Sequence, residues 1–227
     1  MSETRPPRIW SGYLLALILI LCHLSVAGWH GITDNATLIE YGARKPNAGF
    51  PQAPWRLLAS MFLHGGWLHV AANAMLLIFW GTQWARMVGG LGMLCSFLVS
   101  GVWGNLLSDI YGPEAVAVGA SGGTSGLVLA LLCLAFLDPK NPGWYGEQGS
   151  WLRVSAAVVG LNVLMAFGLT SVAGGRLDHW AHVGGAAAGA VLGCLASRGQ
   201  RYFWAALGGL AAGAVLVVVQ RGPSPFG

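Results

Sequence analysis

Three groups of polar side chains interrupt the long apolar runs of this 227-residue chain. His69 and Asn73 lie within one run, Ser121 lies near the start of another, and His182 lies near the start of a third. A serine hydroxyl beside an imidazole can act as a nucleophile activated by a general base. Histidine and asparagine side chains can both donate hydrogen bonds to a developing oxyanion. These residue types suit nucleophilic acyl transfer if the fold brings them together.

Glycines accompany both the serine and the histidine. Gly122 and Gly126 follow Ser121, while Gly185 follows His182 and begins a glycine stripe that recurs every four residues. Small residues at this spacing let two helices approach closely in a membrane. If the two glycine faces pack together, the histidine comes to lie beside the serine. The alternative is that the serine bonds back to its own helix backbone, as serines in membrane helices usually do.

The other polar residues have simpler interpretations. We expect His64 to be a hydrogen-bonding residue in a loop or at a helix start, and His179 to lie at the membrane interface. Asp178 precedes His182 by four residues and could complete a triad. It also stands where a helix N-cap belongs, and we favour that role, which leaves a serine–histidine dyad. His69 and Asn73 are four residues apart and share a helix face. They could instead form hydrogen bonds that hold neighbouring helices together.

The composition indicates a membrane protein. Hydrophobic residues make up 55% of the chain and charged residues only 9%, whereas a soluble domain carries roughly 25% charged residues. The net charge of +4 comes from scattered single Lys and Arg residues, which suit helix ends and do not indicate nucleic-acid binding. The cysteines lie in apolar runs without metal-type spacing, so we expect small buried hydrophobic residues: Cys22, Cys95, Cys133 and Cys194.

Seven apolar segments are each close to the ~20 residues that a membrane-spanning helix needs. Backbone groups in lipid must be bonded internally, which favours helices over open strands. The expected fold is therefore all-α, a polytopic membrane helix bundle forming a single domain over residues 1–227. The first segment could be a signal peptide, but its length favours an uncleaved helix. The segments are approximately 11–30, 61–85, 88–108, 116–137, 153–173, 179–197 and 202–220.

The distribution of Lys and Arg gives a weak bias toward a cytoplasmic N-terminus. That orientation places residues 31–60 outside, as a long loop, and long structured loops usually have a function. The second, fourth and sixth segments then run from outside to inside. Their polar residues therefore sit at a similar depth, nearer the outer face. A bacterial cytoplasmic membrane is the expected location.

Several motifs resemble those of the rhomboid family of intramembrane serine proteases. They occur in the family's order and spacing across roughly residues 50–197, and together they are highly specific. The motifs are Trp55-Arg56, Phe62-Leu-His64-Gly-Gly-Trp67-Leu-His69-Val-Ala-Ala-Asn73, Gly119-Ala-Ser121-Gly122 and Ala181-His182-Val-Gly-Gly185.

The resemblance implies roles for these residues. Ser121 would attack the peptide carbonyl, and His182 would take and return the proton. His69, Asn73 and the backbone N–H of the serine would hold the oxyanion. Arg56 would brace the membrane-embedded first loop. Structural support would come from three glycines: Gly119, Gly122 and Gly185.

The resemblance also implies a fold and a substrate class. A six-helix core over about residues 10–197 would surround the serine-bearing helix, and residues 202–220 would add a seventh helix. Substrates would be single-pass transmembrane proteins in the lipid bilayer, cut near the outer face. No metal and no organic cofactor would be needed, and the oligomeric state stays open.

One departure from the family pattern concerns the position four residues after the nucleophile. Many members carry an aromatic residue there, but this chain has Ser125, which creates a second G-x-S-G motif. We favour Ser121 as the nucleophile. Three alternative functions remain: a membrane protein whose histidines bind a metal or haem, an inactive relative that binds membrane clients, and a small transporter. The sequence has no obvious inverted repeat of the kind that many transporters contain.

Overall fold

The computed structural model describes residues 10–31, 33–45, 53–112, 115–138 and 178–221. Within these ranges the regular secondary structure is helical, apart from one isolated antiparallel bridge between Arg44 and Ala117. The expected all-α fold is confirmed.

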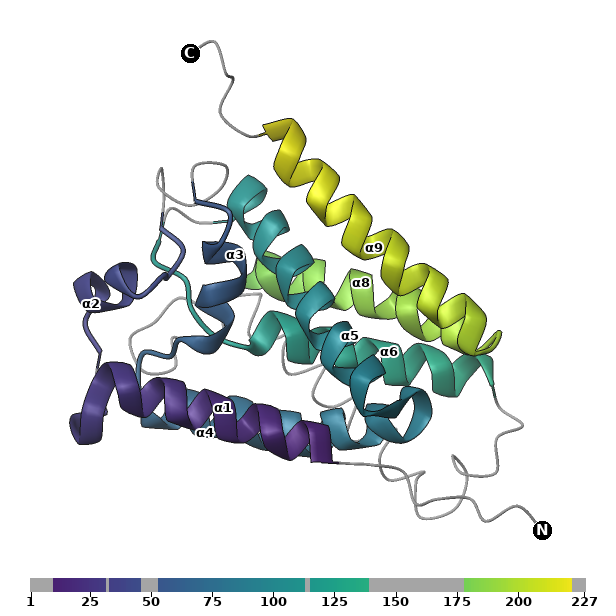
Figure 1. Ribbon diagram of the computed structural model, residues 1–227, viewed down its shortest axis with the longest axis horizontal. Helices are drawn as coiled ribbons and strands as arrows, with labels where there is room; N and C mark the ends of the chain where they lie inside the picture. Colours follow the sequence, from purple (N-terminus) through teal and green to yellow (C-terminus); the bar gives the residue numbers. More distant parts are fainter. Residues whose placement is uncertain (1–9, 32, 46–52, 113–114, 139–177, 222–227) are drawn as a thin grey trace.

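The longer helices correspond to predicted apolar segments (Figure 1), whereas two short helices lie in the predicted first loop, residues 31–60. The expected segment 153–173 lies outside the described residues. The helices are α1 (Trp10–Ala27), followed by a 3-10 turn (Gly28–His30), α2 (Asn35–Glu40), α3 (Arg56–Ala59), a second 3-10 turn (Ser60–Phe62), α4 (Trp67–Leu76), the π-helical η3 (Leu77–Gly81), α5 (Thr82–Tyr111), α6 (Ser121–Leu137), α8 (His179–Ala196) and α9 (Gln200–Arg221).

Two helices start later than the sequence predicted. The second apolar segment was expected from residue 61, but α4 begins at Trp67 because Gly66 has an extended backbone that no helix can contain. The fourth was expected from residue 116, but α6 begins at Ser121. Residues 115–120 are not helical, and Ala117 among them pairs with Arg44 of the first loop in an isolated bridge. Apolar composition alone does not distinguish an embedded extended segment from a helix turn.

The sequence predicted a boundary between the second and third segments at residues 86–87, and the structure has a sharp turn slightly later, at Gly89. Its backbone angles, φ 81° and ψ 163°, are non-helical and interrupt the run of α5. A positive φ of this kind is easy only for glycine. The chain turns back here, so that residues before and after Gly89 form two separate arms of the bundle (Figure 1).

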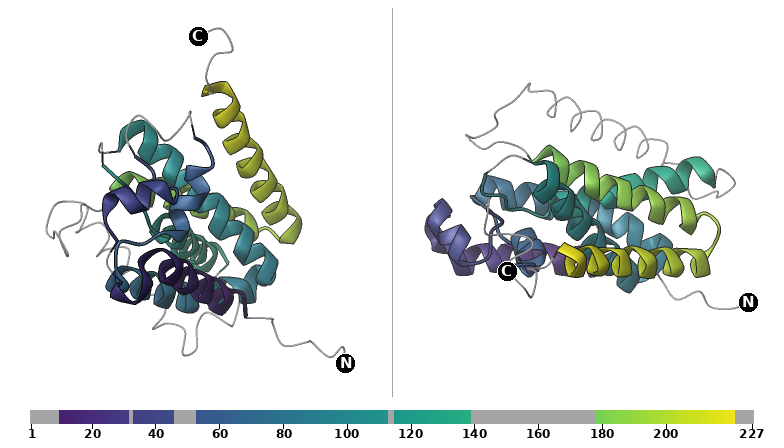
Figure 2. Two further views of the ribbon diagram at one scale, coloured as in Figure 1. Left: turned by 60° about the vertical axis from the view of Figure 1, so that its left-hand side comes forward. Right: turned by 90° about the horizontal axis from the view of Figure 1, so that it is seen from above.

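Helix α6 lies beside α8 (Figure 2), and most of its residues are buried. Gly185 and Gly189 of α8 lie against the carbonyl oxygens of Gly122 and Gly126, and Gly193 continues the contact one turn further on. No side chain separates the two backbones at these points. The predicted packing of the two glycine stripes is therefore confirmed.

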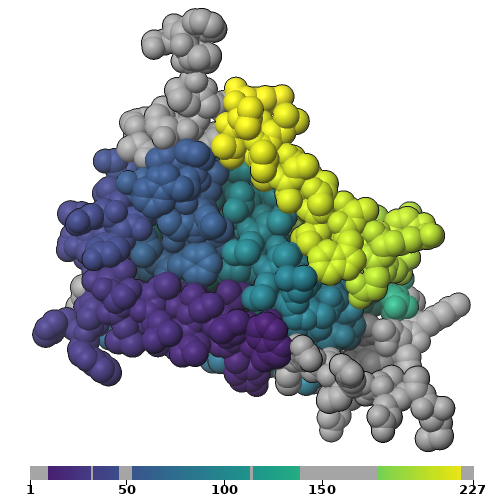
Figure 3. Space-filling view, in the orientation of Figure 1, coloured from purple at the N-terminus to yellow at the C-terminus, as the bar shows by residue number. Residues whose placement is uncertain are grey.

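The outer surface of the bundle is apolar. Helix α9 lies on the outside (Figure 3) and is anchored by the Trp103 indole N–H, which donates to the Leu210 carbonyl oxygen at 2.9 Å. Three stretches are long and apolar enough to cross a membrane: Trp10–His30, Trp67–Tyr111 and Gln200–Gln220. Large aliphatic side chains point outward along them, including Leu17, Leu21, Met75, Leu91, Val215 and Val219. Such a surface suits lipid, and the chain is an integral membrane protein.

Candidate active site

The structure places Ser121 and His182 at adjoining positions on two touching helices. Ser121 is the first residue of α6, and His182 lies in the first turn of α8. A Cβ atom at Gly122, the next residue after the serine, would lie 3.1 Å from the Ala181 carbonyl oxygen, and Gly185 packs on the Gly122 carbonyl. Both side chains are partly buried. Among hydrogen bonds between described residues, none joins the serine hydroxyl to the imidazole, and such bonds are often long before substrate binds.

His69 and Asn73 of α4 face the segment that leads into Ser121. A Cβ atom at Gly119 would lie 2.8 Å from Nε2 of His69 and 4.0 Å from Nδ2 of Asn73. Gly119 has φ +124°, and its N–H donates to the Ser60 carbonyl oxygen at 2.9 Å. Glycine is required here both by the backbone angle and by the histidine ring. His69 is also within electrostatic range of His182, so three helices bring polar groups to one end of the bundle.

The start of α6 is suited to a negative charge. The first helical hydrogen bond runs from the Thr124 N–H to the Ala120 carbonyl oxygen at 3.0 Å, so the N–H groups of Ser121 and the two glycines after it have no acceptor within the helix. These N–H groups and the helix dipole favour an anion at this end. An oxyanion formed at Ser121 would therefore meet backbone donors as well as the α4 side chains.

Arg56 holds the first loop through backbone carbonyls. Its Nη1 donates to the carbonyl oxygens of Ile39 at 2.6 Å and Ala43 at 2.8 Å. Its guanidinium also stacks over the Trp55 ring, 4.7 Å from the centroid. The hydrogen bonds that Arg56 makes in this loop therefore go to backbone carbonyl oxygens of the loop. Earlier in this loop, the hydrogen bond from the Thr37 backbone N–H lowers the pKa of Asp34, which caps α2.

His64 lies in the loop before α4, as predicted, and is buried. Its ring meets the His69 ring edge to face, with centroids 4.8 Å apart. His64 thus packs against the histidine that faces Gly119.

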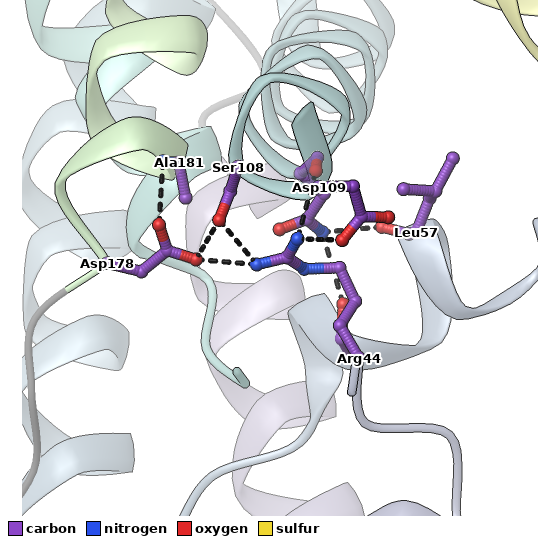
Figure 4. Close-up of polar contacts among 8 residues, drawn as sticks. Arg44, Leu57, Ser108, Asp109, Asp178 and Ala181 are labelled. Carbon is purple, nitrogen blue, oxygen red and sulfur yellow. Dashed lines mark hydrogen bonds and ion pairs between the residues drawn. The ribbon is translucent and has the colours of Figure 1, made fainter. Parts of the chain in front are cut away.

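A charged network at the start of α8 was not predicted from the sequence (Figure 4). Asp178 is the α8 N-cap, as favoured above, because its Oδ1 accepts from the Ala181 N–H at 3.0 Å. Its Oδ2 also accepts from Arg44 Nη2 and from the Ser108 hydroxyl, each at 2.6 Å. Arg44 forms a second ion pair with Asp109. The sequence feature that could have indicated this network is the position of Arg44, Asp109 and Asp178 at the same predicted face of the membrane.

The histidines and cysteines form no obvious metal centre within the described ranges. No group of three or more His, Cys, Asp or Glu side chains there is arranged to hold one metal ion. The four cysteines are free thiols, and each is only partly buried, whereas the sequence interpretation expected buried residues.

Comparison with known proteins identifies the family. Residues 51–199 match the family profile described as the Rhomboid domain. The chain is 32% identical over 178 residues to Rhomboid-type serine protease 2 of Emericella nidulans, which covers 78% of this chain and 33% of the relative. It is 32% identical to RHOMBOID-like protein 2 of Arabidopsis thaliana over 61% of this chain and 41% of the relative. Rhomboid protease GluP of Bacillus subtilis is 29% identical over 78% of this chain and 32% of the relative.

The chain thus spans between 32% and 41% of the length of these relatives. The matched region contains the polar ends of α4, α6 and α8 and the glycine contact between α6 and α8. Family match and all-helical fold agree, and the chain belongs to the rhomboid family of intramembrane serine proteases.

Proposed function

We propose that this protein is an active intramembrane serine endopeptidase that uses a dyad of Ser121 and His182. The observation that carries the proposal is the contact of α6 and α8 through Gly122 and Gly185, because Ser121 directly precedes Gly122 and His182 lies about one turn before Gly185. The names of the fungal and bacterial relatives describe them as proteases, which supports the same activity.

In the proposed reaction, Ser121 Oγ attacks the scissile carbonyl carbon while His182 accepts the hydroxyl proton. The carbonyl electron pair moves onto its oxygen, which is held by the Ser121 N–H, His69 and Asn73. Collapse of this intermediate breaks the peptide C–N bond, and the imidazolium returns its proton to the leaving amine. Water then attacks the acyl-enzyme with the same histidine as base, releasing the new carboxyl end and restoring the serine.

The proposed substrates are single-pass transmembrane proteins cut near the outer face of the membrane. A substrate helix shields its own carbonyl groups by hydrogen bonding, so a scissile segment must first unwind. Helix-weak segments with small residues meet that need. The proposed orientation puts the N-terminus in the cytoplasm of a bacterium, which places the polar end of the bundle beside the outer aqueous phase.

The test is fluorophosphonate labelling of the detergent-solubilised protein, followed by cleavage of a reporter transmembrane substrate in proteoliposomes. We expect the wild type to be labelled, while Ser121→Ala and His182→Ala lose both labelling and cleavage at unchanged thermal stability. Ser125→Ala is the matched control, because it removes the other glycine-flanked hydroxyl one turn later on α6. It should keep measurable activity.

Two results would end the proposal. Wild-type protein that is folded yet neither labelled nor able to cleave any reporter would indicate an inactive client-binding relative. Labelling that survives in Ser121→Ala and disappears in Ser125→Ala would move the nucleophile to the second motif.

A further inference from the structure

Arg44 of the first loop connects the two segments that carry the proposed dyad. Its backbone N–H and carbonyl pair with Ala117 at 3.1 and 3.0 Å, four residues before Ser121. Its guanidinium binds Asp178, which stands four residues before His182. One residue of the first loop therefore contacts the segment leading into the nucleophile and the cap of the helix that bears the base.

The Arg44 guanidinium is held in a fixed position by several hydrogen bonds and ion pairs. Arg44 Nη2 donates to Asp178 Oδ2 and to the Ser108 hydroxyl at 2.7 Å, while Nη1 donates to the Asn105 carbonyl oxygen at 3.1 Å and pairs with Asp109. The Arg44 side chain is only 5% exposed. A planar guanidinium bound to several buried acceptors has little freedom to move. A lysine cannot reproduce the fixed arrangement of its N–H donors.

The bonds of Asp178 transmit that geometry to the first turn of α8 (Figure 4). Oδ2 is held by Arg44, while Oδ1 accepts the Ala181 N–H, and His182 is the next residue. The Ala181 carbonyl oxygen in turn lies against Gly104 of α5 and near Gly122 of α6. The first turn of α8 is thus held on two sides, by the ion pair and by the glycine contacts.

We propose that Arg44 is a positioning residue for catalysis, whose backbone pairing with Ala117 and ion pair with Asp178 together set the distance between Ser121 and His182. This inference rests on the proposed function. Arg44 touches neither reacting side chain, so its effect passes through the Asp178 cap and the Ala117 pairing. A misplacement of about 1 Å at a reacting centre can lower a rate about 100-fold.

The experiment measures the rate constant of fluorophosphonate labelling as a function of probe concentration in folded, full-length protein. Arg44→Gln removes the charge, and Arg44→Lys keeps the charge without the planar set of guanidinium donors. Asp178→Asn keeps a cap acceptor without the ion pair. We expect Arg44→Gln to lower the saturating rate at least about tenfold with an unchanged half-saturating probe concentration. Arg44→Lys should be intermediate. A purely structural arginine would reduce the labelled fraction and the thermal stability but not the rate constant.

A double-mutant cycle separates the ion pair from other effects. Because Arg44→Gln and Asp178→Asn break the same interaction, the double variant should label about as slowly as the slower single variant, not at the product of both losses. Asp34→Asn is the matched control, since Asp34 caps α2 of the same loop through the Thr37 N–H but is exposed. It should label at the wild-type rate.

Each outcome decides one proposal. Wild-type labelling rates in folded Arg44→Gln, or losses that multiply in the double variant, overturn the positioning role and leave the proposed function intact. If Arg44→Gln does not fold, Arg44→Lys and Asp178→Asn carry the same comparison, and a wild-type rate in both overturns the role. A wild type that is not labelled, or a Ser121→Ala variant labelled like it, overturns the proposed function and this inference with it.

Discussion

The contact between Gly185 and Gly122 makes a quantitative prediction about Gly185→Ala. The added Cβ atom would lie 2.7 Å from the carbonyl carbon of Gly122 and 3.2 Å from its Cα, and would overlap the carbonyl oxygen. Carbon atoms in contact normally stand about 3.5–4.0 Å apart. The neighbouring atoms are backbone, so no side chain can rotate away. Helices α6 and α8 must therefore separate by about 1 Å at this level.

That separation occurs one turn after His182 and one residue after Ser121. Because about 1 Å of misplacement can cost about 100-fold in rate, we expect Gly185→Ala to label with fluorophosphonate about 100-fold more slowly than wild type. Overpacking a close contact costs about 1–3 kcal/mol, so the thermal stability should also fall. The assay is the labelling rate at saturating probe, with thermal unfolding measured on the same preparation.

Gly208→Ala is the matched control. Gly208 is a helical glycine of α9, and a Cβ atom there would meet nothing within 4 Å. Alanine favours a helix over glycine by about 1 kcal/mol, so this variant should be as stable as wild type or more so, with an unchanged labelling rate. A Gly185→Ala protein that labels and unfolds like wild type would refute the reasoning, because the two backbones could not then be in contact.

Three further predictions follow from individual contacts. Asn73→Ala should lower the cleavage rate by about 100-fold, or about 3 kcal/mol, if its amide holds the oxyanion, and a wild-type rate would remove it from the site. Arg56→Gln should weaken the two bonds to first-loop carbonyls, lowering stability by about 1–3 kcal/mol in thermal unfolding. Cys194 directly follows Gly193, which packs on Ala130 about one turn before Cys133, so a thiol oxidant should link Cys133 to Cys194 while the other two thiols stay open to alkylation. Equal alkylation of all four would contradict that proximity.

Much of the helical architecture could be predicted from the chain itself. The scarcity of charge and the lengths of the apolar runs determine a membrane bundle, because hydrocarbon admits only backbones that are bonded within themselves. The glycine repeats predicted which faces of α6 and α8 meet, since a stripe without side chains packs best against another such stripe. The N-cap role of Asp178 followed from its position before an apolar run.

Local pattern placed the start of α8 correctly but could not place the starts of α4 and α6. Hydropathy does not reveal the non-helical segment before Ser121, because that segment is as apolar as the helix that follows it. Its conformation is decided by pairing between Ala117 and Arg44, 73 residues apart in the sequence. The late start of α4 likewise depends on the extended backbone at Gly66, and it leaves His64 stacked on His69 in a loop.

The sequence alone determined that the chain is a helical membrane protein of the rhomboid type, and it predicted a serine, two histidines and an asparagine at a similar depth. Only the tertiary structure decided how the first loop takes part. An arginine in a loop has no periodicity and could pair with any of several acids, so its partners are set by the three-dimensional approach of α5 and α8. That approach buries Arg44 between Asp109 and Asp178, where the opposite charges stabilise one another.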